Sequence, residues 1–185
     1  KENQRERSKH PRNGGSTHRF ERGTIRSVLR AEMRTITWNC RGLGNGLAIR
    51  GLLDIREKED PDVLFLSETK LVRSRLEWLR WKLGLTNMMV KDCEGQSGGL
   101  ALFWKNEVNL RVVGFMSRYH IDSEITEEDG FVWRFTGMYG EPKHDDKDKT
   151  WRLMSNLKVQ NNKPWLCSGD FNEVLHPWEK EGGGT

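Results

Sequence analysis

The hydrophobic positions of the first third of the chain follow the order strand, helix, strand. Residues Arg34–Asn39 alternate between apolar and polar side chains, which is typical of a half-buried strand. Leu47–Lys58 has apolar residues at near-helical spacing with charges between them, and the turn at Pro61 ends that helix. Val63–Leu66 is wholly apolar, as in a strand that is covered on both faces. Together these segments predict a βαβ unit.

The pattern then changes from helix to a series of short strands. Leucines at helical spacing predict an amphipathic helix over Arg75–Leu83. Polar and glycine-containing breaks separate the next five apolar runs, which predict an antiparallel meander. A helix at Thr150–Val159 and a strand at Trp165–Ser168 follow. The meander strands are expected at Met88–Lys91, Gly98–Trp104, Val108–Phe115, Tyr119–Thr126 and Phe131–Tyr139.

Polar side chains stand directly after four of the predicted strands, and strand ends are where α/β sheets collect their chemistry. A βαβ crossover brings its two strand ends to one edge of the sheet, so Asn39 and Glu68 should lie together. Tyr139 ends another strand. In the segment PWLCSGDFNE, strand alternation lets Asp170 and Asn172 project from the same side. An Asx-rich turn after a buried strand would use the same residues.

These side chains favour phosphate chemistry that is assisted by a metal ion. One carboxylate, one carboxamide and a third oxygen ligand, completed by water, suit Mg²⁺. The sequence has no Ser/His/Asp spacing, no cysteine nucleophile elbow and no phosphate-loop lysine signature. Its three cysteines, Cys40, Cys93 and Cys167, lack zinc-site spacing and are expected to be reduced packing residues of an intracellular protein.

Charge divides the chain into two parts. At 185 residues there is room for one domain with a sizeable core. Residues 1–34 contain ten Lys or Arg and four acids, whereas the remainder contains 21 and 23. We therefore expect residues 1–32 to be a disordered basic tail and residues 33–185 to be the folded domain. The tail is either an arm that attracts nucleic acid or, as the favoured interpretation, solvated sequence ahead of a natural start at Met33. No apolar run reaches transmembrane length, and no signal peptide is recognisable.

Four motifs carry a resemblance to a known family. They are WNCRGLGN (Trp38–Asn45), LSETK (Leu66–Lys70), TGMYGEP (Thr136–Pro142) and PWLCSGDFNEV (Pro164–Val174). In this order they resemble the endonuclease/exonuclease/phosphatase superfamily. The most similar pattern is that of the apurinic-type endonuclease domain in plant LINE (non-LTR) retrotransposon polyproteins. The resemblance covers about residues 33–184.

The resemblance implies a fold, a reaction and a role for each candidate residue. The fold would be α/β, the N-terminal part of a four-layer αββα sandwich of the DNase-like kind. The reaction would be Mg²⁺-dependent nicking of DNA, with Mn²⁺ as a substitute, in a nuclear polyprotein that also carries a reverse transcriptase. Glu68 and, beside it, Asn39 would bind the metal, and Tyr139 would support the scissile phosphate. Asp170 would orient or deprotonate the attacking water, and Asn172 would hold that water and the transition state. Lys70 resembles a lysine that contacts the acidic cluster or a phosphate, and Arg41 and Asn45 are candidates for DNA contact that turn formation explains equally well.

The chain also departs from the family pattern. Members continue past GDFNE to a terminal Asp and a Ser-Asp-His motif, which this sequence lacks. We therefore expect a domain that is incomplete at its C-terminus, with weak or lost activity. Two alternatives stay open. One is a phosphomonoesterase of the same superfamily that acts on inositol phosphates, lipids or nucleotides, and the other is a non-enzymatic remnant that binds nucleic acid.

Overall fold

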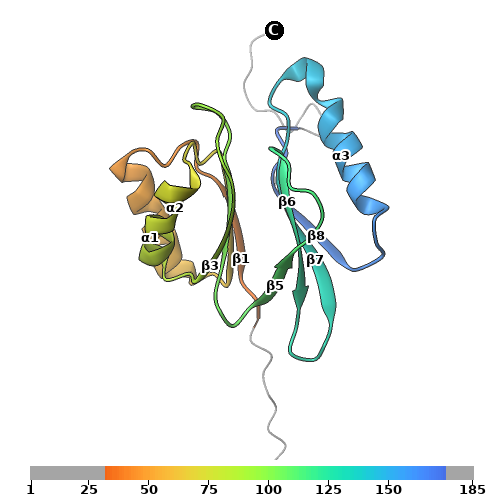
Figure 1. Cartoon of the computed structure of the whole chain (residues 1–185), viewed down its shortest axis with the longest axis horizontal. Coiled ribbons are helices and arrows are strands. Elements are labelled where there is room, and N and C mark those ends of the chain that lie inside the picture. The colour runs from red at the N-terminus through yellow and green to blue at the C-terminus, as the bar shows by residue number, and fades with distance from the viewer. Residues whose placement is uncertain (1–31, 174–185) are drawn as a thin grey trace, which may run out of the picture. The chain divides into compact units, whose positions relative to one another are not determined.

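The computed structural model describes residues 32–173, which fold into two four-stranded sheets with helices on their outer faces (Figure 1). The first sheet has the order β1 (Thr35–Asn39), β2 (Val63–Ser67), β4 (Leu100–Trp104), β3 (Asn87–Lys91). The second has the order β5 (Asn109–Val112), β6 (His120–Thr126), β7 (Val132–Tyr139), β8 (Trp165–Asp170). The helices are α1 (Gly46–Glu59), α2 (Arg73–Leu83) and α3 (Asp148–Lys158), and a 3-10 turn at His144–Asp146 precedes α3.

The first sheet contains the predicted βαβ unit. β1 and β2 pair in parallel, with Asn39 opposite Ser67, and α1 makes the crossover. The Asn45 side chain caps α1 by accepting a hydrogen bond of 2.8 Å from the amide of Ala48. Helices α1 and α2 cover the outer face of this sheet with buried leucines, as the spacing predicted. The buried residues of this layer include Leu52, Leu76, Leu79 and Leu83 from the helices and Leu64, Leu66 and Phe103 from the strands.

The two sheets pack face to face through a second cluster of buried side chains. Phe65 and Leu102 of the first sheet meet Ile121 and Phe135 of the second, and all four are fully buried. The sheets approach closely at Gly137, where an added Cβ would stand 2.5 Å from Cγ of Phe65. The described residues therefore form a helix, sheet, sheet, helix arrangement, which confirms the predicted fold class.

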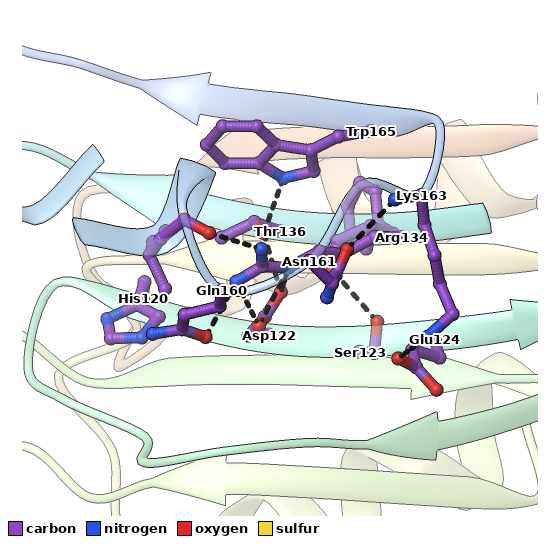
Figure 2. A network of polar contacts seen from close by, with 12 residues as sticks. His120, Asp122, Ser123, Glu124, Arg134, Thr136, Gln160, Asn161, Lys163 and Trp165 are labelled. Atoms are coloured by element: carbon purple, nitrogen blue, oxygen red, sulfur yellow. Dashed lines mark hydrogen bonds and ion pairs between the residues drawn. The ribbon is translucent and has the colours of Figure 1, made fainter. Parts of the chain in front are cut away.

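The outer face of the second sheet holds a buried ionic network beneath α3 (Figure 2). The Arg134 guanidinium is 1% exposed and donates to both carboxylate oxygens of Asp122 at 2.6–3.0 Å. It also donates to the carbonyl of Leu157 in α3 at 2.5 Å, and it lies 5.2 Å from the centroid of the Trp165 ring. Thr136 completes the network by donating to Asp122 and accepting from the Trp165 indole. This network joins β6, β7, β8 and α3.

The predicted single meander is wrong, because its strands divide between the two sheets. β3 and β4 pair with each other, and β4 also pairs with β2, whereas β5 to β7 belong to the second sheet. The chain changes sheets at residues 105–108. The strand expected over Val108–Phe115 is also shorter, since β5 ends at Val112 and Phe115 is 83% exposed in the following loop.

Among the described residues, no helix combines the length and the apolar character that crossing a bilayer would need. The expected basic tail falls almost entirely on residues 1–31, which lie outside the described residues. So do residues 174–185, which follow the GDFNE segment.

Candidate active site

The carboxyl ends of four strands meet where the two sheets lie side by side. β1 and β2 end together at Asn39 and Ser67, and the parallel pair β7 and β8 ends at Tyr139 and Asp170. A hydrogen bond of 3.0 Å between the hydroxyls of Thr37 and Ser168 links β1 to β8. The sequence placed a carboxamide, a phenol and two carboxylates at strand ends, and the structure brings these ends to one place.

The side chain of Asn39 joins the carboxylates of the two sheets. Its amide nitrogen donates to Oε1 of Glu68 and to Oδ2 of Asp170, each at 2.8 Å. The two carboxylate oxygens can therefore be no farther apart than twice that distance. The Asn39 oxygen faces the other way and accepts from the backbone amide of Arg41 at 3.0 Å. The side-chain N–H groups of Asn39 thus stabilise two neighbouring carboxylates. The predicted role as a metal ligand would instead use its side-chain oxygen.

Tyr139 points its phenol into the same cluster. The hydroxyl donates to Oε1 of Glu68 at 3.0 Å, and the residue is 9% exposed. Burial, followed by the hydrogen bond to the Glu68 carboxylate and its negative charge, raises the pKa of Tyr139 to about 12. The phenol is therefore protonated at neutral pH and available as a hydrogen-bond donor.

The GDFN segment forms a tight turn that fixes Asp170 and Asn172. The amide of Asn172 donates to Oδ1 of Asp170 at 2.9 Å, and its side-chain nitrogen donates to the Gly140 carbonyl at 2.8 Å. Lys147, at the start of α3, donates to the carbonyl of Asn172. An added Cβ at Gly140 would overlap the Phe171 carbonyl, so this close approach requires glycine. Oδ1 of Asp170 is therefore held by the turn itself, and Oδ2 is held by Asn39 of the first sheet.

Left-handed backbone is concentrated at this edge. Of the five non-glycine residues with positive φ among those described, four belong to the strand-end segments. This conformation costs about 1–2 kcal/mol per residue for side chains other than glycine. Strain of this kind gathers at sites that position functional groups, and here it sets the direction in which the candidate side chains leave the sheets. The four residues are Arg41 (φ 49°), Glu68 (φ 53°), Lys70 (φ 53°) and Asn172 (φ 53°).

The side chains of the three predicted substrate-binding residues take no part in the hydrogen bonds of the cluster. Within residues 32–173 the exposed Lys70 ammonium makes no ion pair, and its methylene stem packs against Gly42. The Arg41 side chain is exposed, and only its backbone amide contacts Asn39. Asn45 caps α1, which supports its interpretation as a turn residue. Lys147 was not among the predicted residues, because one lysine in a charged loop carries no distinguishing signal.

The donor set fits a magnesium ion. Within the part of the chain that the structure describes, no three His, Cys, Asp or Glu side chains gather as a metal cluster. Magnesium does not need such a cluster, because it keeps several waters and is held through one or two carboxylates. Glu68 and Asp170 supply two carboxylates that converge on one carboxamide. They are the residues that would hold the ion.

Comparisons with known proteins agree with this architecture. The model of the Endonuclease/Exonuclease/phosphatase family matches residues 36–184, whereas the search of curated proteins finds no similar sequence. An AP endonuclease from Archaeoglobus fulgidus has a TM-score of 0.62 at 16% identity, over 82% of this chain and 62% of its own. An AP endonuclease from Leishmania major has a TM-score of 0.58 at 18% identity, over 82% and 59%.

A phosphatase has a similar structure as well. A mannosyl-6-phosphatase from Bacteroides thetaiotaomicron has a TM-score of 0.56 at 16% identity, over 79% of this chain and 68% of its own. At these identities the likeness concerns the fold, and the chain spans about three fifths of the length of either AP endonuclease. The family match over residues 36–184 includes every strand end of the candidate site. The chain therefore belongs to the Endonuclease/Exonuclease/phosphatase family.

Proposed function

We propose that this chain carries the centre of a divalent-metal-dependent DNA phosphodiesterase that cuts one strand of a duplex. The observation that carries the proposal is the amide of Asn39, which draws together Glu68 from one sheet and Asp170 from the other. Phosphodiester hydrolysis needs an oriented water and donors for the negative charge that grows on the phosphate. The cluster offers groups for both tasks.

Asp170 is the residue that we assign to the water. Each of its carboxylate oxygens accepts one hydrogen bond, Oδ1 from Asn172 and Oδ2 from Asn39. A carboxylate oxygen has a second lone pair, so Asp170 retains acceptor capacity for the proton of an attacking water. Because the sheet edge and the GDFN turn hold both oxygens, the direction in which Asp170 accepts is fixed before substrate binds.

Tyr139 and Asn172 are the residues that we assign to the phosphate. The high pKa of Tyr139 keeps its proton on the phenol, which can donate to a phosphate oxygen once it turns away from Glu68, its present acceptor. The Asn172 side-chain nitrogen donates to the carbonyl of Gly140, the residue that follows Tyr139. Magnesium, or manganese in its place, would be held by Glu68 and Asp170 and would neutralise charge on the phosphate as a Lewis acid.

The choice of DNA as substrate rests on charge and on motif resemblance. Arg41 and Lys70 are exposed cations on the segments that leave Asn39 and Glu68. The four motifs resemble the endonuclease domain of plant LINE retrotransposons, in which the nick supplies the primer for a reverse transcriptase in the same polyprotein. We accordingly propose a nuclear role in target-site nicking, with a reverse transcriptase domain as partner.

The test is nicking of supercoiled plasmid by the purified chain with Mg²⁺ and with EDTA. We expect relaxed circles only with the metal, and Asp170→Asn should lower the rate about 10²-fold or more, as expected for loss of a group that handles a proton. The control is Glu57→Gln, an exposed carboxylate on α1, which should leave the rate unchanged.

The phosphomonoesterase alternative is supported by the structural likeness to the mannosyl-6-phosphatase. Release of inorganic phosphate from small phosphomonoesters while plasmid stays supercoiled would replace the proposal with this alternative. Intact plasmid and no phosphate release from a folded protein would contradict both enzymatic functions.

A further inference from the structure

A pocket of about 390 Å³ lies between α1 and α2, away from the carboxylate cluster. Leu43, Ile49 and Leu71 give it an apolar lining, and Arg75 and Trp78 of α2 line it from the other side. Its volume is within the usual range of small-ligand pockets, about 300–1,000 Å³. None of the candidate site residues lines it, so the proposed hydrolysis leaves the pocket unexplained.

The pocket is built from the same two segments that carry the candidate site. Residues 43–49 follow Asn39 by way of the exposed Arg41, and residues 71–79 follow Glu68 by way of the exposed Lys70. The segments stay together beyond the strand ends, because the Leu43 amide donates to the Thr69 carbonyl at 3.0 Å. Each of the two segments therefore places one exposed cation, Arg41 or Lys70, between the candidate site and the pocket. A strand of nucleic acid that runs from one to the other would meet both.

The segments that lead into the pocket are basic, although Glu77 of α2 lies between Arg75 and Trp78 in the sequence. Residues 40–53 and 69–76 contain five Lys or Arg and no acid. On α2, Arg73 and Arg80 both pair with Glu77. Arg75 is exposed, and within residues 32–173 it makes no ion pair. A polyanion would therefore meet an uncompensated guanidinium at the rim of the pocket.

Trp78 is exposed although its helix is well buried on the other side. Leu76, Leu79 and Leu83 form the buried face of α2, whereas Trp78 is 53% exposed. The Lys82 ammonium lies 5.1 Å from the centroid of its ring. An exposed indole beside cations is the combination with which proteins stack single-stranded bases, because every base offers an aromatic face and its phosphates are negative.

We propose that this pocket, which we call the Trp78 pocket, takes an unpaired base of the DNA strand that crosses the candidate site. Trp78 provides the stacking face, the leucines and Ile49 surround the base edge, and Arg75 binds the adjoining phosphate. The proposal rests on the proposed DNA substrate. It adds that the chain prefers DNA that has unpaired bases in the strand that crosses the site.

The experiment measures binding of labelled DNA to the full chain by fluorescence anisotropy in EDTA, where cleavage is excluded. One probe is a short duplex with a single-stranded gap, and the second has abasic sites throughout the gap, so that the phosphates are the same and the bases are missing. Trp78→Ala should weaken binding of the first probe about tenfold, the effect of removing one base-stacking aromatic. It should leave binding of the abasic probe unchanged, and Trp78→Phe should restore most of the affinity.

Trp81→Ala is the matched control. Trp81 lies on the same helix and is 70% exposed, but it does not line the pocket. Its replacement should leave binding of both probes unchanged, and both alanine variants should share the wild-type unfolding midpoint. Arg75→Ala should weaken binding of both probes and lower the salt dependence by about one phosphate contact.

The proposal is overturned if Trp78→Ala weakens both probes equally, or no more than Trp81→Ala does. It is also overturned if an apolar peptide binds at Trp78 and displaces neither DNA probe, which would indicate a protein partner. Its failure is distinguishable from failure of the proposed function. Plasmid nicking with no effect at Trp78 would reject the pocket alone, whereas base-dependent binding without nicking would reject the hydrolysis alone.

Discussion

Replacing Arg134 by methionine would remove a buried charge and keep most of the side-chain stem. The guanidinium is 1% exposed and its partner Asp122 is 2% exposed (Figure 2). Without it, Asp122 would keep a single described donor, the Thr136 hydroxyl at 2.7 Å, and the Leu157 carbonyl would lose its hydrogen bond from the guanidinium. The perturbation thus leaves a carboxylate buried without its counter-charge.

The expected magnitude follows from that uncompensated charge. Removing one partner of a buried ion pair costs about 3–5 kcal/mol, because the desolvated partner stays behind. A domain of this size has a total stability of about 5–15 kcal/mol, so Arg134→Met should remove a large part of it. Asp122→Leu should have a similar cost, since it leaves the guanidinium buried.

The assay is urea unfolding followed by circular dichroism, with free energies extrapolated to water. The double variant Arg134→Met with Asp122→Leu tests the reasoning further. Replacement of a whole buried pair by apolar residues is often neutral, so the double variant should be more stable than the sum of the single costs predicts, by about 2 kcal/mol. A cost below about 1 kcal/mol for Arg134→Met, or strict additivity, would refute the assignment, because solvated surface pairs behave in that way.

Further predictions concern packing, thiol reactivity and acid stability. Gly137→Ala should destabilise the chain by about 1–3 kcal/mol in thermal unfolding, because its Cβ meets the buried Phe65 ring. Gly51→Ala in α1 should stabilise the chain by up to about 1 kcal/mol, because a Cβ there meets nothing within 4 Å. Burial raises the pKa of Cys167 to about 12, so iodoacetamide at about pH 8 should label it far more slowly in the folded chain than in urea, as read by peptide mass spectrometry. Above pH 9 the thiol of the unfolded chain ionises first, and stability should fall as pH rises toward 12. Burial lowers the pKa of His120, so the unfolded chain takes up the proton first as pH falls below about 6.5, and the stability of the fold should decrease there. A smaller decrease in the His120→Gln variant would confirm that His120 causes it, and a decrease equal to that of the wild type would contradict this.

The sequence predicted the contacts that depend on strand direction. Alternation over Arg34–Asn39 and the apolar run Val63–Leu66 implied a parallel pair, and a parallel pair must bring Asn39 and Glu68 together. The period of two likewise placed Asp170 at the end of β8. The roles assigned to these residues stay predictions, because the structure supplies their geometry and the nicking assay supplies their chemistry.

The sequence could not predict which sheet each strand would join. Hydrophobic alternation records that a strand has one buried face, and it does not record the partner, so β3 and β5 had similar patterns yet belong to different sheets. Arg134 shows the same limit. It occupies an ordinary polar position in an alternating strand, and its burial depends on α3, which follows later in the chain. Trp78 falls on the outward side of its helix, where nothing local separates a docking side chain from a surface one.

The hydrogen bonds of Asn39 have a thermodynamic consequence for the whole domain. Glu68 belongs to one sheet and Asp170 to the other, and each sheet satisfies its backbone within itself. A fluctuation that parts the sheets would therefore dissolve the carboxylate cluster while leaving both hydrogen-bonded ladders intact. A cation held between the two carboxylates would bind the docked form only, and its binding free energy would be added to that of docking. Chelation should then loosen the sheet interface and expose the Phe65 and Phe135 side chains to a hydrophobic dye, while the strand amides stay protected from hydrogen exchange.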